Sequence, residues 1–372
     1  MNKRVKIGLA GCGSVSQRGL LPHLSQPDIQ DRVELRAVMD VVAERARASA
    51  EKFGAAECYA DYEEMLDKSD LDAVVIASPI GVHFQQGMKA VAAGKHVHLN
   101  KTMTTTSEEA NQLIEASRKA GVILVASPGQ MQWPAYQQVK KLVEEGVIGR
   151  VYWALIGRSW IGHEYEGFRR GDDILSDVDP LWYYQRRAGG GPMYDMTVYS
   201  LHTLTGILGS AQRVCGLSGI GLTERHFKDQ RVQVDMDDNT HLLLDFGDSV
   251  YGQVYGTFAS GPRRPELQIS GSGGSIDVGW QEITIYGDPS LLDMTGAKLS
   301  IPVRRELPYV RGVHKDIEEF HVYNDIMHLV DCIREGKRPT VTAEHARHVI
   351  EIIEKGYQSA RTGRTVELIT SF

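Results

Sequence analysis

The sequence predicts an α/β fold: an N-terminal Rossmann domain with a doubly wound parallel sheet, then a C-terminal α+β domain with a large, open, mainly antiparallel sheet. The chain has 372 residues, and at about 150 residues per domain this length suits two domains. Strand and helix patterns alternate up to residue 125, which indicates a parallel sheet with helical crossovers. Polar and apolar residues alternate over most of residues 213–303, which indicates antiparallel strands. We therefore expect domains over residues 1–125 and 126–372.

Composition and charge exclude several classes of protein. Hydrophobic residues make up 42% and charged residues 24%, as in an ordinary globular chain. The net charge of −7 is spread along the chain, whereas a nucleic-acid binder needs a clustered basic footprint. The sequence has neither the long apolar run of a membrane span nor the apolar core of a signal peptide. Its four cysteines form no CxxC pair, so we expect neither a disulfide framework nor a zinc knuckle, and a cytoplasmic location.

In the N-terminal half, short apolar runs alternate with helical patterns. Each expected helix ends at a glycine, which favours a helix C-terminus, and the last begins with the capping-box pair Thr106 and Glu109. The expected strands cover residues 5–10, 33–39, 71–77, 96–99 and 122–126, and the expected helices cover residues 41–53, 83–93 and 106–120.

The C-terminal half mixes helices with alternating strands. We expect helices over residues 135–145, 192–208, 321–334 and 343–361, and strands over residues 151–157, 241–246, 250–258, 266–269 and 283–286. The glycine cluster at residues 271–274 precedes strand-like sequence, so we interpret it as a hairpin turn. In the strand over residues 250–258, Val254 and Phe258 point one way and Tyr251 and Tyr255 the other. One face would pack on helices and the other would form a subunit interface, so we expect a homodimer or homotetramer.

A glycine-rich loop follows the first strand. Gly11 and Gly13 let the backbone turn tightly and approach a pyrophosphate at the start of the next helix, and Ser16 takes the place of a third glycine. The residues expected to touch a dinucleotide here are Gly11, Cys12, Gly13, Ser14 and Val15. An ordinary glycine turn is the alternative, but the position of the loop at the first strand–helix junction favours a dinucleotide.

Asp40 ends the second strand, where a carboxylate accepts hydrogen bonds from the adenosine ribose and repels a 2′-phosphate. This favours NAD as the cofactor. Arg45 and Arg47 lie nearby in the sequence, so use of NADP stays open.

Two motifs carry a resemblance to a known family. The first comprises Ser78-Pro79-Ile80, His83, Gly94-Lys95-His96-Val97 and Asn100-Lys101-Thr102; the second comprises Gly189-Gly190-Gly191, Asp195, Tyr199 and His202. Together they resemble the Gfo/Idh/MocA oxidoreductases, named for glucose-fructose oxidoreductase and inositol dehydrogenase. Asn100 and Thr102 depart from the Glu and Pro that flank the family lysine. The resemblance implies hydride transfer between NAD(P) and a secondary hydroxyl of a sugar, sugar derivative or cyclitol.

The resemblance also implies roles for individual residues. Cofactor contacts would come from Ser78, Pro79, His83, Asn100 and Lys101, and the catalytic set would be Lys101, Asp195, Tyr199 and His202. Lys101 and Tyr199 would touch the reacting oxygen, with the cationic nicotinamide lowering the pKa of the lysine. Asp195 would orient the lysine or a substrate hydroxyl. The i, i+4, i+7 spacing puts Asp195, Tyr199 and His202 on one helix face, where His202 would bind a second hydroxyl or accept the proton.

Aromatic and donor residues precede the triple glycine and suit a polyhydroxylated ring. The expected substrate contacts are Trp160, Trp182, Tyr183 and Arg186, with His163 as a further candidate, although core packing explains one or two of them equally well. The paired histidines of the sequence lack a third ligand nearby, so we expect no metal. Two other functions stay open: an NAD-dependent glycoside hydrolase or lyase that oxidises the ring transiently, and a non-catalytic sensor of sugar and NAD.

Overall fold

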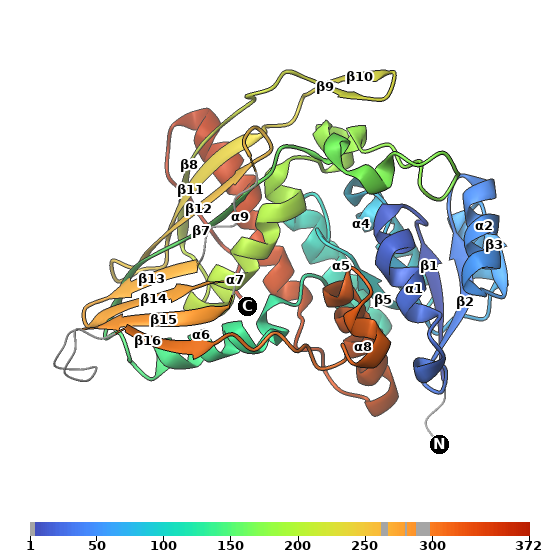
Figure 1. The fold of residues 1–372 in the computed structure, drawn as a ribbon, viewed down its shortest axis with the longest axis horizontal. Coiled ribbons are helices and arrows are strands. Elements are labelled where there is room, and N and C mark those ends of the chain that lie inside the picture. Colours follow the sequence, from blue (N-terminus) through green and yellow to red (C-terminus); the bar gives the residue numbers. More distant parts are fainter. Residues whose placement is uncertain (1–3, 262–266, 280, 288–297) are drawn as a thin grey trace.

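The computed structural model describes residues 4–261, 267–279, 281–287 and 298–372. Two large sheets lie beside each other, and helices pack on both of them (Figure 1). One is a six-stranded parallel sheet and the other a nine-stranded mixed, mostly antiparallel sheet. The fold class expected from the sequence is confirmed.

The N-terminal sheet has the strand order β3-β2-β1-β4-β5-β6, with every neighbouring pair parallel. Its strands are β1 (Val5–Ala10), β2 (Val33–Met39), β3 (Glu57–Tyr59), β4 (Ala73–Ile76), β5 (His96–Leu99) and β6 (Leu124–Ala126). The chain runs outward from β1 in both directions, so the carboxyl ends of β1 and β4 form the switch point where open α/β sheets bind ligands.

Helices cover both faces of this sheet. One face packs on α1 (Leu21–Leu24), α2 (Ala43–Phe53) and α8 (Phe320–Glu335), and the other on α3 (Tyr62–Lys68), α4 (His83–Ala92), α5 (Ser107–Ala120) and the first turns of α9 (Ala343–Thr362). Because α8 and α9 come from the end of the chain, the polypeptide returns to the N-terminal sheet after building the second one. The domain division at residue 126 stays a prediction.

The second sheet has the order β16-β15-β14-β13-β7-β12-β11-β8-β17, and only the β7–β12 pair is parallel among these neighbours. Its strands are β7 (Val151–Ser159), β8 (Arg213–Gly219), β11 (Asn239–Asp245), β12 (Tyr251–Thr257), β13 (Leu267–Gly271), β14 (Gly274–Val278), β15 (Glu282–Gly287), β16 (Lys298–Pro302) and β17 (Val366–Glu367). A separate ribbon joins β9 (Glu224–Phe227) to β10 (Gln230–Gln233). Gly271 pairs with Gly274, which confirms the expected hairpin. Residue 266, the expected first residue of a strand, lies outside the described residues.

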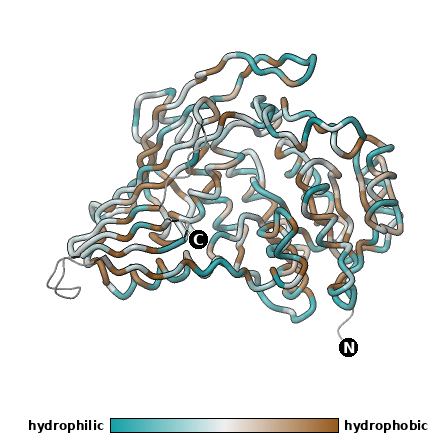
Figure 2. The backbone as a smooth tube through the Cα atoms, viewed as in Figure 1, coloured by the Kyte–Doolittle hydropathy of each residue, from teal (hydrophilic) through white to brown (hydrophobic). Residues whose placement is uncertain are grey.

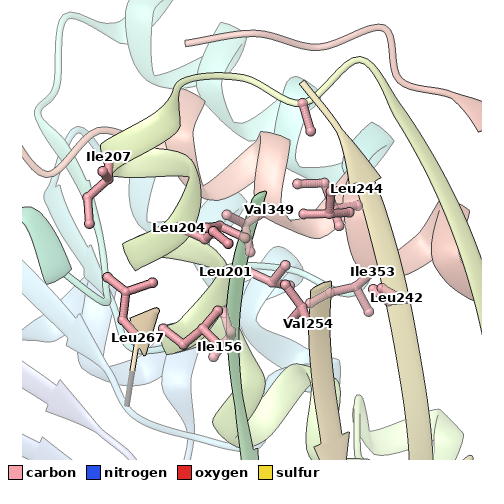
Figure 3. Close-up of a cluster of buried hydrophobic side chains, with 14 of the residues drawn as sticks. Ile156, Leu201, Leu204, Ile207, Leu242, Leu244, Val254, Leu267, Val349 and Ile353 are labelled. Carbon is pink, nitrogen blue, oxygen red and sulfur yellow. The ribbon is translucent and has the colours of Figure 1, made fainter. Parts of the chain in front are cut away.

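The inner face of this sheet packs on α6 (Pro134–Glu144), α7 (Val198–Leu208) and α9. Figure 3 shows Leu201 and Leu204 of α7 and Val349 of α9 lying against Leu242 and Val254 of the strands. All five side chains are at most 2% exposed, and each contributes about 1.5–3 kcal/mol by leaving water. This core fixes α7, and with it the residues just before and within that helix, against the sheet.

The outer face of the sheet exposes large apolar side chains. Leu217 is 78% exposed, Leu243 50%, Trp153 45% and Tyr251 43%, while Val254 on the opposite face is fully buried. The hydropathy colours of Figure 2 show the corresponding alternation along the strands. The expected two-sided character of β12 is therefore present.

No helix in the described part of the chain has the length and apolar character that a membrane span requires. All four cysteines carry free thiols, two buried and two exposed.

Candidate active site

The loop after β1 is shaped for a ligand. Gly11 has φ +97°, and a Cβ there would lie 2.7 Å from the backbone nitrogen of Ser78, so only glycine fits. At Gly13 a Cβ would meet no atom within 4 Å, which leaves open space over the loop. Ser16 is fully buried and donates a hydrogen bond to the Gly11 carbonyl oxygen at 2.5 Å, so it packs where a third glycine was expected. Cys12 is fully buried beneath the loop, and Ser14 is 7% exposed.

Asp40 lies directly beside this loop. Its carboxylate accepts hydrogen bonds from the backbone nitrogens of Cys12 and Val42, both at 2.9 Å. The guanidinium of Arg45 lies 3.3 Å from the Asp40 carboxylate and also donates to the carbonyl oxygens of Ile174 and Asp177. The open space at Gly13, and a carboxylate at the end of β2 where Rossmann domains bind the adenosine ribose, fit a dinucleotide. Gly11, Cys12, Gly13, Ser14 and Asp40 would hold it.

His83 connects the loops after β4 and β5. One ring nitrogen lies 2.8 Å from the Ser78 carbonyl oxygen, and the other 2.9 Å from that of Thr102. Burial lowers the pKa of His83 to about 4. The neutral ring donates to one of these two carbonyl oxygens and lies between the two loops. Pro79 is exposed at the tip of the first of these loops.

Lys101, at the end of β5, binds Asp195 from the turn that leads into α7. Its Nζ donates to the Asp195 carbonyl oxygen at 2.6 Å and pairs with the Asp195 carboxylate. The neighbouring Thr102 donates from its hydroxyl to the Tyr194 carbonyl oxygen at 2.6 Å, and Asn100 accepts from the Lys101 backbone nitrogen at 2.8 Å. Burial would lower the pKa of Lys101, but the Asp195 carboxylate outweighs it and raises that pKa. Lys101 is therefore an ammonium. Thr102 stands where the family has a proline, and its hydrogen bond to Tyr194 holds this segment in place.

His163 binds the second carboxylate oxygen of Asp195, at 2.6 Å from its Nε2. Its Nδ1 lies 2.9 Å from Glu166, which also accepts from Arg169 at 2.6 Å. Burial opposes charge on His163, but the carboxylates at its two nitrogens raise its pKa. Lys101 and His163 likewise overcome burial and hold the pKa of Asp195 well below its usual range. His163, expected as a substrate contact, thus lies behind Lys101 as part of a charge network.

Tyr199 completes the group. Its ring centroid lies 5.7 Å from the Lys101 ammonium and 5.2 Å from the Arg158 guanidinium carbon. Its hydroxyl lies 2.9 Å from Nε2 of His321. Burial raises the pKa of Tyr199 above its ordinary value, so the phenol is protonated. The structure brings Lys101, Asp195 and Tyr199 together.

His202 is placed elsewhere. Three residues turn an α-helix by about 300°, so His202 lies roughly 60° around the helix from Tyr199. Its ring is 4.7 Å from that of His345 on α9, and its Nδ1 lies 2.8 Å from the Val198 carbonyl oxygen. The side chain is 3% exposed and burial lowers its pKa to about 4. These contacts give His202 a packing role between two helices, and its Nε2 is buried without a hydrogen-bond partner. Its catalytic role stays a prediction.

The expected substrate contacts divide into two groups. The rings of Trp182 and Tyr183 are stacked at 3.7 Å, and Tyr183 lies 4.1 Å from the ring of His163, so these aromatics adjoin Asp195. Trp160 packs against a separate apolar cluster, and its Nε1 is buried without a hydrogen-bond partner. Arg186 is exposed and donates to the Asp235 carbonyl oxygen at 3.1 Å. The structure does not place Arg186 with the Lys101 group.

Sequence reasoning missed Glu166, Arg169 and His321. Glu166 and Arg169 belong to an irregular segment of short 3-10 turns with no motif. His321 is 122 positions from Tyr199, at the start of a helix whose pattern indicates only amphipathic packing. The described residues contain no group of three or more His, Cys, Asp or Glu side chains arranged to hold a metal.

A phosphate-type glycine loop at the switch point, with a lysine, a carboxylate and a phenol near the end of β5, defines a dinucleotide-dependent oxidoreductase of the Rossmann class. Family models match both halves of the chain and agree with this class of protein. The oxidoreductase family with an NAD-binding Rossmann fold matches residues 5–127, and the GFO/IDH/MocA C-terminal domain matches residues 136–277. The chain belongs to the Gfo/Idh/MocA family of NAD(P)-dependent oxidoreductases.

Relatives in this family act on different compounds. A scyllo-inositol 2-dehydrogenase (NADP(+)) of Bacillus subtilis is 25% identical over 98% of this chain and 96% of its own. A D-apiose dehydrogenase of Paraburkholderia graminis is 25% identical over 98% of this chain and 90% of its own. Among solved structures, levoglucosan dehydrogenase in complex with NADH and levoglucosan superposes with a TM-score of 0.81 at 20% identity, over 98% of this chain and all of the other. That structural likeness supports the fold.

Proposed function

We propose that this protein transfers a hydride between NAD(P) and a secondary hydroxyl of a sugar, sugar derivative or cyclitol. The observation that carries the proposal is the placement of the Lys101 ammonium against Asp195 with the Tyr199 phenol beside it. The names of the relatives, which include inositol, apiose and levoglucosan dehydrogenases, support this class of substrate.

The roles of the residues follow from their charges. NAD, when bound, accepts the hydride in the direction of oxidation. Lys101, held as an ammonium, donates a hydrogen bond to the reacting oxygen and stabilises negative charge on it. Asp195 and His163 keep that ammonium oriented, and Tyr199 exchanges a proton with the same oxygen. The sequence suggested a lysine with a lowered pKa. The contact with Asp195 favours the charged form, so Lys101 serves as an electrostatic donor and Tyr199 as the group that exchanges a proton with the substrate.

Trp182, which is half-buried and stacks on Tyr183 beside His163, would offer its outer face to the C–H face of a ring. Trp160 remains a candidate because its indole N–H has no partner.

For the cofactor, the preference proposed is NAD. Asp40 stands where the adenosine ribose is bound in Rossmann domains, and Arg45 is already engaged by Asp40 and by two backbone carbonyls. An arginine held in this way is not free to bind a 2′-phosphate. The Bacillus subtilis relative is named as an NADP(+) enzyme. The affinities of the present protein for NAD and for NADP should therefore be measured side by side.

The test is turnover with a panel of aldoses, sugar derivatives and cyclitols, followed by NADH absorbance in one direction and by consumption of NADH with the keto compounds in the other. Oxidation of at least one of these compounds, lost on Lys101→Met, is the expected result. Glycoside cleavage or elimination without net formation of NADH would instead favour the alternative function, an NAD-dependent glycoside hydrolase or lyase. Binding of NAD and sugar without any product would favour the sensor.

The exposed face of the second sheet is proposed as the contact with another copy of this chain. Leu217, Leu243, Trp153 and Tyr251 line neighbouring strands there, and an apolar face of this kind is typical of subunit interfaces. A homodimer or homotetramer and a cytoplasmic location remain predictions.

A further inference from the structure

The Tyr199 hydroxyl has a partner that no family motif contains. His321, in the first turn of α8, approaches the phenol with its Nε2 at 2.9 Å, and the two rings meet edge to face at 5.5 Å between centroids. Because the phenol is protonated, Tyr199 donates this hydrogen bond and the histidine accepts it. Accepting at Nε2 places the proton of a neutral imidazole on Nδ1.

Charged groups face His321 from every element around it. Glu319, which precedes the helix, has a carboxylate oxygen 3.8 Å from Nε2, and Arg18 from the helix after the glycine loop binds Glu319 in turn. Lys101 from the end of β5 and Arg158 from β7 add positive charge. Burial, together with these cations, lowers the pKa of His321 despite Glu319, so the ring is neutral and able to accept a proton.

His321 also has a route to solvent. Its side chain is 24% exposed, whereas those of Lys101 and Asp195 are 14% and 2% exposed. A proton that reaches this ring can pass to water without crossing the buried charge pair. Lys101, held as an ammonium by Asp195, has no capacity to take up the proton itself.

We propose that His321 receives the proton of the substrate hydroxyl through Tyr199 and passes it to water. The inference rests on the proposed function and acts on the same reaction. In oxidation, the substrate O–H bond breaks and its proton goes to the Tyr199 oxygen, while the Tyr199 proton goes to Nε2 of His321. The Nδ1 proton of the resulting imidazolium leaves to water, and Glu319 stabilises that cation. The C–H electron pair leaves with the hydride, which the oxidised dinucleotide accepts, and reduction runs each transfer in reverse.

A purely structural role would look different in experiment. In that case the Tyr199–His321 hydrogen bond would only fix α8 against α7, and its loss would lower stability without changing the dependence of the rate on pH. Proton transfer through Tyr199 to His321, here called the relay, instead changes kcat and its pH profile. KM is kept, because His321 acts through Tyr199 and does not touch the substrate.

The first measurement needs neither cofactor nor substrate. Long-range ¹H–¹⁵N NMR of the full-length protein would follow the titration of His321 in the wild type and in Tyr199→Phe. Loss of the donated hydrogen bond removes a contact that favours the neutral ring, so the pKa of His321 is expected to rise in the variant. An unchanged titration would show that the phenol does not donate to this nitrogen, and would overturn the proposal.

The second measurement is kinetic and uses His321→Gln, with His328→Gln as the matched control on the same helix. His328 accepts a hydrogen bond from the Thr340 backbone nitrogen at 2.9 Å and does not contact Tyr199. For oxidation of a competent polyol, His321→Gln should lower kcat by about tenfold or more, keep KM within about threefold and remove the acid limb of the pH profile. Added imidazole should restore part of the rate.

The outcomes separate the two proposals. If the wild type oxidises a polyol and His321→Gln has unchanged kcat and pH profile, the relay is wrong and the proposed function stands. If the wild type oxidises none of the panel, the proposed function fails and the relay with it, whatever the NMR titration shows.

Discussion

The Nζ of Lys101 lies 2.6 Å from the backbone carbonyl oxygen of Asp195, and the carboxylate of the same residue binds both Lys101 and His163. One residue therefore holds the ammonium through its main chain and its side chain at once. The main-chain contact depends on the π-helical turn Met193–Thr197 that precedes α7, and π-helical turns are frequent at functional sites. The arrangement fixes the direction of the ammonium before any substrate arrives.

Replacing Lys101 with Met should remove the electrostatic donor while leaving the dinucleotide loop intact. We expect kcat to fall by about a hundredfold or more, with the dissociation constant for NAD changed by less than about threefold. Steady-state rates and titration of NADH fluorescence measure the two quantities. Lys89→Met, which removes an exposed lysine on α4, is the control. A loss in kcat below about tenfold would refute a role for Lys101 in the chemical step.

The glycine loop offers two substitutions with opposite consequences. Gly11→Ala places a Cβ 2.7 Å from the Ser78 backbone at φ +97°, so the cofactor-free protein should lose stability. Gly13→Ala meets no protein atom within 4 Å, so the melting temperature without cofactor should stay within about 2 °C of the wild type. The new methyl group would occupy the space over the loop, and we expect NAD affinity to fall by about tenfold. Unchanged NAD affinity in Gly13→Ala would place the pyrophosphate elsewhere.

The fold was predictable because its signals are local. Buried apolar runs and helix-ending glycines marked β2 and β5 at the observed residues and α5 to within one residue. Several elements had no expected range, and among them β3, α3 and β17 escaped because strands of two or three residues and a helix of seven carry too few positions to show a period.

The site was predictable only where motifs name its residues. Lys101, Asp195 and Tyr199 meet, as the resemblance implied. His321 could not be found because the contact joins two helices far apart in the chain, and nothing in a short amphipathic pattern marks one histidine. The contact of His202 with His345 was not foreseen, because helical spacing alone does not say which neighbouring element each side of a helix meets. Here α9 lies on that side.

Asp40 should decide between the two dinucleotides. Asp40→Asn removes the charge that repels a 2′-phosphate and keeps one of the two oxygens that accept from the Cys12 and Val42 backbone nitrogens. The ratio of the dissociation constants for NADP and NAD should fall by about tenfold, measured by calorimetry with each cofactor. Glu51→Gln, an equal change of charge at an exposed position of α2, is the control. An equal ratio in the wild type and Asp40→Asn would mean that another residue sets the preference.

The outer sheet face should control assembly. Leu243→Asp puts a charge at a side chain that is 50% exposed, next to β8 and β12. Such a change costs the isolated subunit little but is unfavourable inside an apolar interface. Light scattering after size exclusion should show a shift from oligomer to monomer with an unchanged far-UV circular dichroism spectrum. Leu222→Asp, exposed at 43% beside the β9–β10 ribbon, is the control, and equal masses for all three proteins would exclude this face as the interface.

His202 should make the protein sensitive to acid. Burial lowers its pKa to about 4, whereas in the unfolded chain the ordinary value of about 6.5 applies. Between these two values the unfolded chain binds a proton that the folded protein refuses, so the free energy of unfolding falls as the pH decreases from about 6.5 to about 4, and is unaffected by this group above that window. In His202→Phe, which keeps a ring between α7 and α9, the loss on acidification should be smaller by about 1–3 kcal/mol. Urea unfolding at several pH values measures it, with the exposed His226→Gln as the control. Parallel curves for the wild type and His202→Phe would show that the folded protein tolerates a charged imidazole at this position.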